Sequence, residues 1–238
     1  SYPTIFAPEP ENCKNIEKAN FNICNDALNC AGTQDNRKKL ETTDFNVVRI
    51  TCNELDGING QWGTGIVIGP NRVLTAAHVT EIQRFCFGDP LIVYQGGNGI
   101  GSVAQKYPVA SMKIHPSYNR NADNHFEHDL AVLTTTETFT QYKPFSRAPD
   151  PLDFKGLTWT GYPSDLVQRD RVFSQWETQH PLYRDNGSLY IYNLHVCAVS
   201  EVGQSGSGLI TVDNGNVIGI LARRMCTRNS FKYSFYAS

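Results

Sequence analysis

The sequence predicts an all-β protein with two β units of similar size, preceded by an arm that contains cysteines. From residue 45 onward, short runs rich in Val, Ile, Thr and aromatic residues alternate with Gly, Pro and Asn turn signals. Their spacing of roughly ten residues is typical of a β-sandwich or barrel. A proline-rich link, "KPFSRAPDPL" at 143–152, divides the runs near the middle. We therefore expect the arm at 1–44, a first β unit at 45–142 and a second at 143–238.

The arm holds three of the seven cysteines, Cys13, Cys24 and Cys30, and shows little hydrophobic periodicity. One stretch, "KNIEKANFNICNDAL", could form a short helix, and we expect two of the three cysteines to pair. The arm starts with "SYPTIFAPEP", without a methionine, which is typical of a processed chain. Its last part, "NRKKLETT", contains a basic triplet, which we interpret as a solvated turn in preference to a processing site.

The candidate strands follow in order along both units. Those of the first unit are "FNVVRITC", "GTGIVIG", "RVLTAA", "DPLIVYQGG", "YPVASMKIH" and "DLAVLTTT". Those of the second are "LTWTGYP", "RVFSQWETQ", "GSLYIYNLHVCAV", "SGLITVD" and "NVIGILARR". The segment "VDNGNVIG" predicts a tight hairpin, because Asn214 and Gly215 tolerate positive φ angles.

Composition excludes several classes of partner. The 238-residue chain is 40% hydrophobic and 18% charged, with a formal net charge of −2, so it offers no basic surface for nucleic acid and no polybasic membrane anchor. It has no apolar run of the roughly 18–20 residues that span a bilayer. The scattered cysteines lack zinc-ligand spacing and favour disulfides in an oxidising compartment, so we expect a secreted protein without a metal. The sequon at Asn186 is a glycosylation candidate and agrees with secretion.

Three residues have the types that nucleophilic catalysis needs. A serine nucleophile requires a base that accepts its proton, and the base requires a carboxylate that orients it. Ser205 lies in the glycine-rich stretch "GQSGSGL", His78 follows small residues in "LTAAHV", and Asp129 precedes an apolar strand in "HDLAVL". An α/β-hydrolase would need a histidine after the serine, and no histidine follows Ser205.

In the order His, Asp, Ser, the motifs "TAAH", "DLAVL" and "GQSGS" resemble the signatures of chymotrypsin-like serine proteases. Smaller motifs, "GTGIVIGPNRVLTAAHV", "TGYP" and "GQSGSGL" followed by "VIGI", resemble the glutamyl endopeptidases and staphylococcal V8-like proteases. The resemblance implies two antiparallel six-stranded β-barrels and an endopeptidase that forms an acyl-enzyme. It makes His78, Asp129 and Ser205 the catalytic residues, with the amides of Gly203 and Ser205 as the oxyanion hole.

The same resemblance implies a substrate pocket lined by Ser200, Leu221, Ala222, Arg223 and Arg224. Glutamyl endopeptidases have a histidine where Leu221 stands. Either arginine could replace that histidine in binding a substrate carboxylate, or both could point to solvent. The resemblance also implies loop-tying disulfides Cys52–Cys86 and Cys197–Cys226. Digestive members have an aspartate before the serine that pairs with a newly freed N-terminus, and the neutral Gln204 cannot form that pair.

The expected protein is thus a monomeric serine endopeptidase that acts on polypeptides and has no cofactor, with cleavage after acidic residues as the specificity that a carboxylate-binding arginine would give. Two alternatives remain: a catalytically silent protease fold with a binding or toxin-like role, and a protease of narrow specificity whose pocket Arg223 and Arg224 block. We interpret "HFEH" at 125–128 as a surface loop rather than a metal site, since no third ligand is evident.

Overall fold

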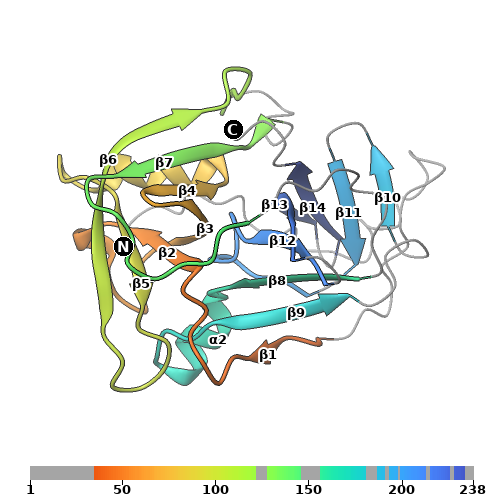
Figure 1. Ribbon diagram of the computed structural model, residues 1–238, viewed down its shortest axis with the longest axis horizontal. Helices are drawn as coiled ribbons and strands as arrows, with labels where there is room; N and C mark the ends of the chain where they lie inside the picture. Colours follow the sequence, from red (N-terminus) through yellow and green to blue (C-terminus); the bar gives the residue numbers. More distant parts are fainter. Residues whose placement is uncertain are drawn as a thin grey trace.

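The computed structural model describes residues 35–121, 128–145, 156–180, 187–190, 193–197, 199–212, 215–225 and 228–233. For residues 180, 187–190, 193–197, 223–225 and 228–233 it describes the backbone. Their regular secondary structure is mostly β-strand, as predicted, and the strands form two groups that lie side by side (Figure 1). The strands are accompanied by a short α-helix, α2 (Ser164–Asp170), and by two 3₁₀ helices, η1 (Asn53–Leu55) and η2 (Ala77–Phe85).

The first group of strands closes into a six-stranded antiparallel barrel in the order β2-β3-β4-β7-β6-β5. Its strands are β2 (Val47–Thr51), β3 (Gly63–Gly69), β4 (Arg72–Thr75), β5 (Ile92–Gly96), β6 (Ala104–Ile114) and β7 (Ala131–Thr135). All five residues of β2 are buried, which suits its β-branched sequence "VVRIT". A closed six-stranded barrel, predicted through the family resemblance, is therefore confirmed.

The second group forms an eight-stranded sheet in the order β1-β9-β8-β12-β13-β14-β11-β10. Its strands are β1 (Lys38–Lys39), β8 (Leu157–Gly161), β9 (Trp176–His180), β10 (Gly187–Tyr190), β11 (Asn193–Cys197), β12 (Gly208–Thr211), β13 (Val217–Met225) and β14 (Arg228–Tyr233). The prediction was six strands here. One of the differences is β1, which belongs to the arm and pairs with the edge of β9.

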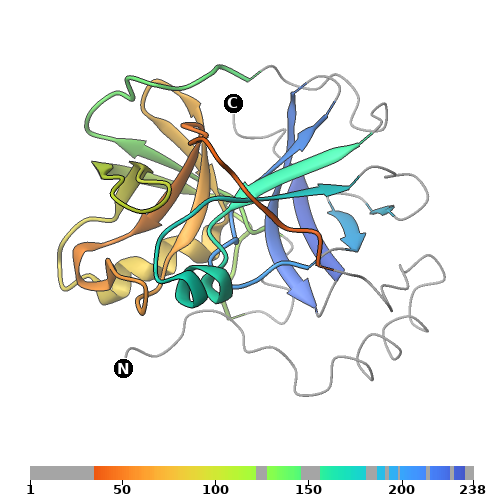
Figure 2. The same ribbon diagram turned by 90° about the horizontal axis from the view of Figure 1, so that it is seen from below.

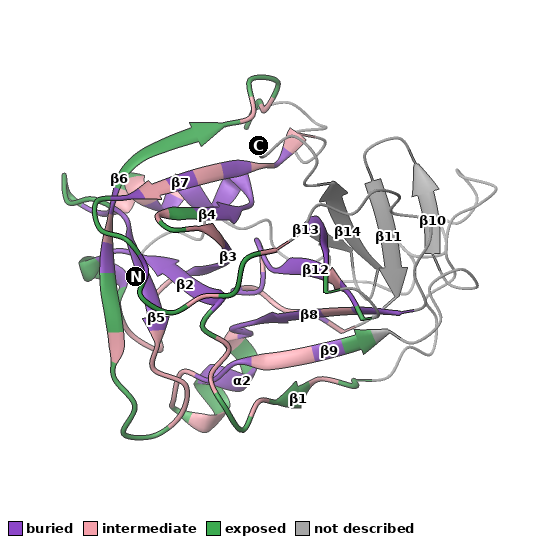
Figure 3. Cartoon of the chain, in the orientation of Figure 1, coloured by how far each residue is buried: buried purple, intermediate pink, exposed green. Residues whose placement is uncertain are grey.

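The hydrophobic core extends from the first barrel to the second sheet. Val217 and Ile220 of β13 belong to the same buried cluster as the first-barrel residues Ile66 and Leu74. Buried positions are concentrated in β2, β3, β8 and β12 (Figure 3). A smaller cluster of Val47, Trp62, Tyr162 and Val167 connects the first barrel to α2, which lies where the two groups of strands meet (Figure 2). The core thus fixes the two groups of strands against each other.

The hairpin expected at 212–219 joins β12 to β13. Gly215 has a φ of +66°, its N–H donates to the carbonyl of Thr211, and the Thr211 N–H donates to the carbonyl of Asn216. Positive φ at this glycine is what the predicted turn requires. Within the described ranges, none of the helices has the length and apolar character needed to cross a membrane.

Candidate active site

His78 lies where β4 ends and η2 begins. The small residues Ala76 and Ala77 are fully buried, and η2 starts at Ala77, so His78 lies in the first turn of that helix. The His78 residue is 7% exposed, so its ring is nearly enclosed but still reaches the surface. The strand thus ends where the sequence changes from β-branched residues to alanines, and the helix that follows carries the His78 imidazole.

Asp129 orients His78 through two hydrogen bonds. Asp129 is fully buried, just before β7. Its Oδ1 accepts from the His78 backbone N–H at 2.7 Å, and its Oδ2 lies 2.5 Å from His78 Nδ1. Because a carboxylate only accepts, this contact places the proton on Nδ1 and leaves Nε2 as the basic nitrogen. The predicted pair of His78 and Asp129 is therefore in contact and has the tautomer that a general base needs.

The loop that carries Ser205 is held between the two groups of strands. From β3, Thr64 donates its N–H to the Ser205 carbonyl at 2.8 Å and its Oγ1–H to the Gly203 carbonyl at 2.7 Å. From β13, the carbonyl of Leu221 accepts the Gly206 N–H at 2.8 Å. Ser205 itself is half-buried. Thr75, three residues before His78, donates its hydroxyl to the Thr64 carbonyl, so the serine loop and the histidine share one support.

Two glycines of this loop have backbone conformations that other residues rarely adopt. Gly203 has a φ of +97° and Gly206 a φ of +92°. A Cβ at Gly203 would overlap the Tyr162 carbonyl oxygen, and one at Gly206 would overlap the Thr64 carbonyl oxygen and the Thr75 hydroxyl. Positive φ and close backbone approach both require glycine here. These requirements account for the two glycines that flank the Gln204–Ser205 pair.

The backbone amides of the loop divide into two sets. Gln204 donates to the Glu201 carbonyl at 3.1 Å, Gly206 to that of Leu221 and Ser207 to that of Gln204. Within the part of the chain that the structure describes, the amides of Gly203 and Ser205 have no acceptor. Two backbone donors two residues apart, held by a rigid loop, can stabilise a negatively charged oxygen.

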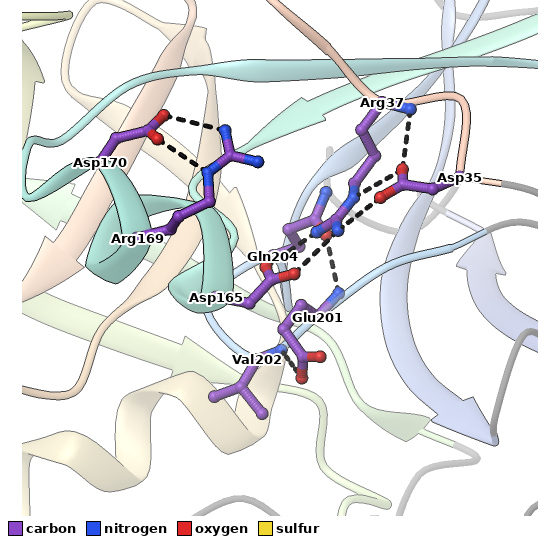
Figure 4. Close-up of polar contacts among 8 residues, drawn as sticks. All are labelled: Asp35, Arg37, Asp165, Arg169, Asp170, Glu201, Val202 and Gln204. Carbon is purple, nitrogen blue, oxygen red and sulfur yellow. Dashed lines mark hydrogen bonds and ion pairs between the residues drawn. The ribbon is translucent and has the colours of Figure 1, made fainter.

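Gln204 is fully buried next to these donors. Its Oε1 accepts the Glu201 N–H at 2.7 Å, and Glu201 Oε1 accepts the Val202 N–H at 2.9 Å (Figure 4). Gln204 Nε2 has no hydrogen-bond partner among the described residues. The neutral Gln204 side chain therefore closes a hydrogen bond within the loop.

The expected pocket residues are described in part. Ser200, Leu221 and Ala222 are buried, with exposures of 1%, 3% and 1%. The backbone of Leu221 bonds both Gly206 and Ser207, so it supports the serine loop directly. Arg223 and Arg224 lie in β13 and pair in register with Ser230 and Asn229 of β14, after a register shift between Leu221 and Arg223. Their side chains lie outside the described part.

Of the expected disulfides, Cys52–Cys86 is confirmed and joins the end of β2 to the end of η2, on either side of His78. The Cys197–Cys226 pairing, Asn186 and the arm cysteines Cys13, Cys24 and Cys30 lie outside the residues and side chains described. His125 of "HFEH" also lies outside the described residues. The ring of His128 stacks on the ring of His115, with a distance of 4.8 Å between the ring centroids. Burial, and secondarily the charge of His128, lowers the pKa of His115.

Sequence patterns gave no indication of two further supports of the site. Trp62 donates its Nε1–H to the Tyr162 carbonyl at 2.8 Å, the same carbonyl that Gly203 approaches. Tyr118 lies near the Asp129 carboxylate: burial, with the negative charges of Asp129 and Glu81, raises the pKa of Tyr118. Neither residue belongs to a recognisable motif, and only the folded chain brings them to the site.

Comparisons with known proteins agree with this geometry. The model of the trypsin family matches residues 45–238. Similar solved structures include a Glu endopeptidase in complex with MPD, with a TM-score of 0.63, 20% identity and coverage of 86% of this chain and 93% of that chain. Human heparin binding protein is also similar, with a TM-score of 0.60, 16% identity and coverage of 84% of this chain and 91% of that chain. So is the VesB protease of Vibrio cholerae, with a TM-score of 0.60, 15% identity and coverage of 83% of this chain and 63% of that chain. A search of curated proteins gives no match.

At these identities the solved structures show a common fold and no more. The family model covers most of the chain, including the segments that carry His78, Asp129 and Ser205. The chain belongs to the trypsin family, the serine proteases of chymotrypsin fold.

Proposed function

We propose that this protein is a secreted serine endopeptidase with Ser205 as nucleophile, His78 as general base and Asp129 as the residue that orients the base. The observation that carries the proposal is the fully buried Asp129 carboxylate, which accepts two hydrogen bonds from His78 and leaves Nε2 as the basic nitrogen. The free amides of Gly203 and Ser205 in the described residues support it. The Cys52–Cys86 disulfide supports an oxidising, extracellular location.

The reaction follows from these roles. Ser205 Oγ attacks the scissile carbonyl carbon while His78 Nε2 accepts its proton, and the imidazolium that forms is stabilised by Asp129. The carbonyl oxygen becomes negatively charged and accepts hydrogen bonds from the Gly203 and Ser205 amides, each worth about 3–4 kcal/mol in transition-state stabilisation. His78 then donates the proton to the leaving amine. Water, deprotonated by His78, hydrolyses the acyl-enzyme and regenerates Ser205.

Cleavage profiling tests the proposal. The full chain is incubated with a diverse peptide library, with Ser205→Ala as the matched control. We expect cleavage products from the natural chain and none above background from the control, with equal thermal stability of both. Labelling by a fluorophosphonate, which reacts with activated serines, should follow the same pattern. Equal cleavage by both proteins would assign the activity to a contaminant or another residue and contradict the proposal.

Within the family, we propose a preference for Asp or Glu before the scissile bond, as in the V8-like branch. Two arginines follow the buried Ala222 in β13, and a guanidinium binds a carboxylate with two parallel hydrogen bonds. Arg223→Gln and Arg224→Gln should each be profiled beside the natural chain. We expect one of them to lower kcat/KM for acidic sites by about 100-fold or more while cleavage at other sites persists. Cleavage by the natural chain without a preference for acidic sites would exclude the preference, and an unchanged acidic profile in both variants would exclude the arginines as its cause.

A non-catalytic binding role is the second candidate, since one similar structure is a heparin binding protein. The net charge of −2 argues against a polyanion as ligand. Absence of fluorophosphonate labelling in well-folded natural protein would favour this role. Labelling without cleavage of library peptides would instead favour a protease of narrow specificity.

A further inference from the structure

We propose that Arg37, in the segment before the first barrel, is a positioning residue for the oxyanion hole. Residues 35–40, here named the strap, would hold helix α2 in place through Arg37, and α2 would in turn hold the loop that carries the Gly203 amide. The inference rests on the proposed function, because it concerns the donors that stabilise the transition state.

The Arg37 side chain is buried between two carboxylates, with 4% of it exposed. Its Nη1 and Nη2 donate to the two carboxylate oxygens of Asp165 at 2.8 Å each. Nε and Nη2 donate to Asp35 at 3.0 and 2.9 Å (Figure 4). Burial opposes the charge of Arg37, but the hydrogen bonds to Asp165 and Asp35 outweigh it and raise its pKa. A two-point guanidinium–carboxylate contact fixes orientation as well as distance, which an exposed pair does not.

Asp165 connects this contact to the oxyanion loop. It is the second residue of α2, and the preceding residue, Ser164, donates its N–H to the Val202 carbonyl at 2.8 Å. Val202 directly precedes Gly203. The carbonyl oxygen of Tyr162, two residues before Ser164, is the atom nearest to the position that a Cβ of Gly203 would occupy. The start of α2 therefore contacts the loop on both sides of the peptide bond that supplies the Gly203 amide.

The residue at the centre of the loop carries no charge. Gln204 is fully buried and neutral, and its Nε2 has no partner among the described residues. A loop that must keep two amides aimed at one point needs external restraint, because hydrogen-bond donors stabilise a transition state only when they are held in place beforehand. The Arg37–Asp165 pair, joined through Ser164 to Val202, supplies such a restraint.

The strap is itself fixed to its surroundings at several points. Lys38 and Lys39 form β1 and pair with Glu177 and Trp176 of β9. The Leu40 N–H donates to the Gln175 carbonyl at 2.9 Å, and the Leu40 carbonyl accepts from Asn98 Nδ2 at 3.2 Å. These backbone contacts hold Arg37 at a defined place relative to both groups of strands, so it can transmit restraint to α2.

The test compares Arg37→Ala with Arg169→Ala in the full chain. Arg169 is the matched control, because it lies on the same helix and pairs with Asp170 at 2.8 Å, but its side chain is 61% exposed and the pair faces away from the loop (Figure 4). The readouts are kcat and KM for a peptide that the natural chain cleaves, expressed per folded molecule from near-ultraviolet circular dichroism. Fluorophosphonate labelling rates are measured in parallel.

We expect Arg37→Ala to lower kcat by about 10-fold or more, a fraction of the loss of a whole oxyanion donor, with KM within about twofold. Arg169→Ala should change neither constant by more than about twofold. Arg37→Lys, which keeps the charge but not the two-point contact, should restore part of kcat. Asp165→Asn should reproduce the effect, and combining it with Arg37→Ala should add little, because both changes break one contact.

The outcomes separate this inference from the proposed function. If natural chain and Ser205→Ala are equally unreactive, the proposed function fails and the inference with it. If the natural chain is active but Arg37→Ala matches Arg169→Ala in kcat per folded molecule, the positioning role is overturned while the serine protease assignment stands. If Arg37→Ala fails to fold, the positioning role is tested with Asp165→Asn instead. An unchanged kcat in that variant overturns the positioning role of Arg37.

Discussion

In the proposed mechanism, the base function of His78 depends on Asp129. Its fully buried carboxylate accepts the backbone N–H and faces Nδ1 of His78. Asp129→Asn should lower kcat by about 10,000-fold, because an amide group can donate to Nδ1 and so favours the unproductive tautomer. Peptide-cleavage rates between pH 6 and 9 check this. A loss below about 10-fold, with unchanged thermal stability, would mean that another group orients His78.

Gly206 shows how the loop geometry depends on single residues. Gly206→Ala would combine a φ of +92° with overlap on Thr64 and Thr75, and should destabilise the fold by about 3 kcal/mol. Gly215→Ala is the matched control, since its φ is also positive, at +66°, but nothing lies within 4 Å of the added Cβ. Gly215→Ala should lower the free energy of unfolding by about 1 kcal/mol, because it introduces backbone strain without steric overlap. Urea denaturation of both variants separates strain from overlap, and equal losses would contradict the overlap.

At the scale of elements, the strap should respond to acid through Asp35. The hydrogen bond from Arg37 is the largest cause that lowers the pKa of Asp35 from its ordinary 3.8. Because the pKa is lower in the folded state, Asp35 stabilises the fold above about pH 4, and this contribution is lost as the pH falls through the lowered pKa. It should amount to about 1 kcal/mol or less, because 49% of the Asp35 side chain is exposed.

Thermal melts of the natural chain and Asp35→Asn from pH 2.5 to 7 measure this contribution. The variant should melt lower at pH 6, and the difference should shrink as the pH falls below the ordinary Asp pKa of 3.8 and through the lowered pKa of Asp35. In the Arg37→Ala background the same substitution should have almost no effect, because the partner is gone. A difference in melting temperature that is constant across the whole pH range would show that the ionisation of Asp35 is not involved.

Elements signalled by local patterns were predicted, and those that depend on distant partners were not. The strands of the first barrel, the turn at Gly215 and the Cys52–Cys86 disulfide follow from neighbouring residues or from a family resemblance. "NRKK", by contrast, was interpreted as a solvated turn. Lys38 and Lys39 are indeed exposed, but the Arg37 side chain is buried on Asp165, 128 residues away. The sequence around a charged residue in a polar run does not indicate which distant carboxylate it will pair with, or that the pair will bury its side chain.

At the scale of the whole molecule, the site exists only where the two groups of strands meet. His78 and Asp129 come from the first barrel, whereas the loop with Ser205 joins strands of the second sheet. Thr64 of the first barrel bonds that loop at Gly203 and Ser205. Any change that shifts one group of strands against the other therefore displaces His78 relative to Ser205, even without altering either residue.

Gln175 connects the two groups at a distance from the site. It is fully buried, its Nε2 contacts the carbonyls of Asp44 and Val47 and the hydroxyl of Tyr162, and its Oε1 accepts the Asp44 N–H. Burial raises the pKa of that Tyr162 hydroxyl to about 12, so it remains protonated at neutral pH. One amide thus satisfies groups from the first barrel, the second sheet and the chain before β2.

Gln175→Ala should lower the free energy of unfolding by about 3 kcal/mol, because several buried polar groups lose their partner at once. For a chain of this length that corresponds to a fall of about 6–12 °C in melting temperature. Gln179→Ala, at an exposed position of strand β9, which follows Gln175, should shift the melting temperature by less than about 2 °C. Scanning calorimetry with parallel activity assays measures the melting temperatures of both variants. If Gln175→Ala melts at the same temperature as Gln179→Ala, the shared apolar core maintains the contact between the groups of strands and the buried amide is dispensable.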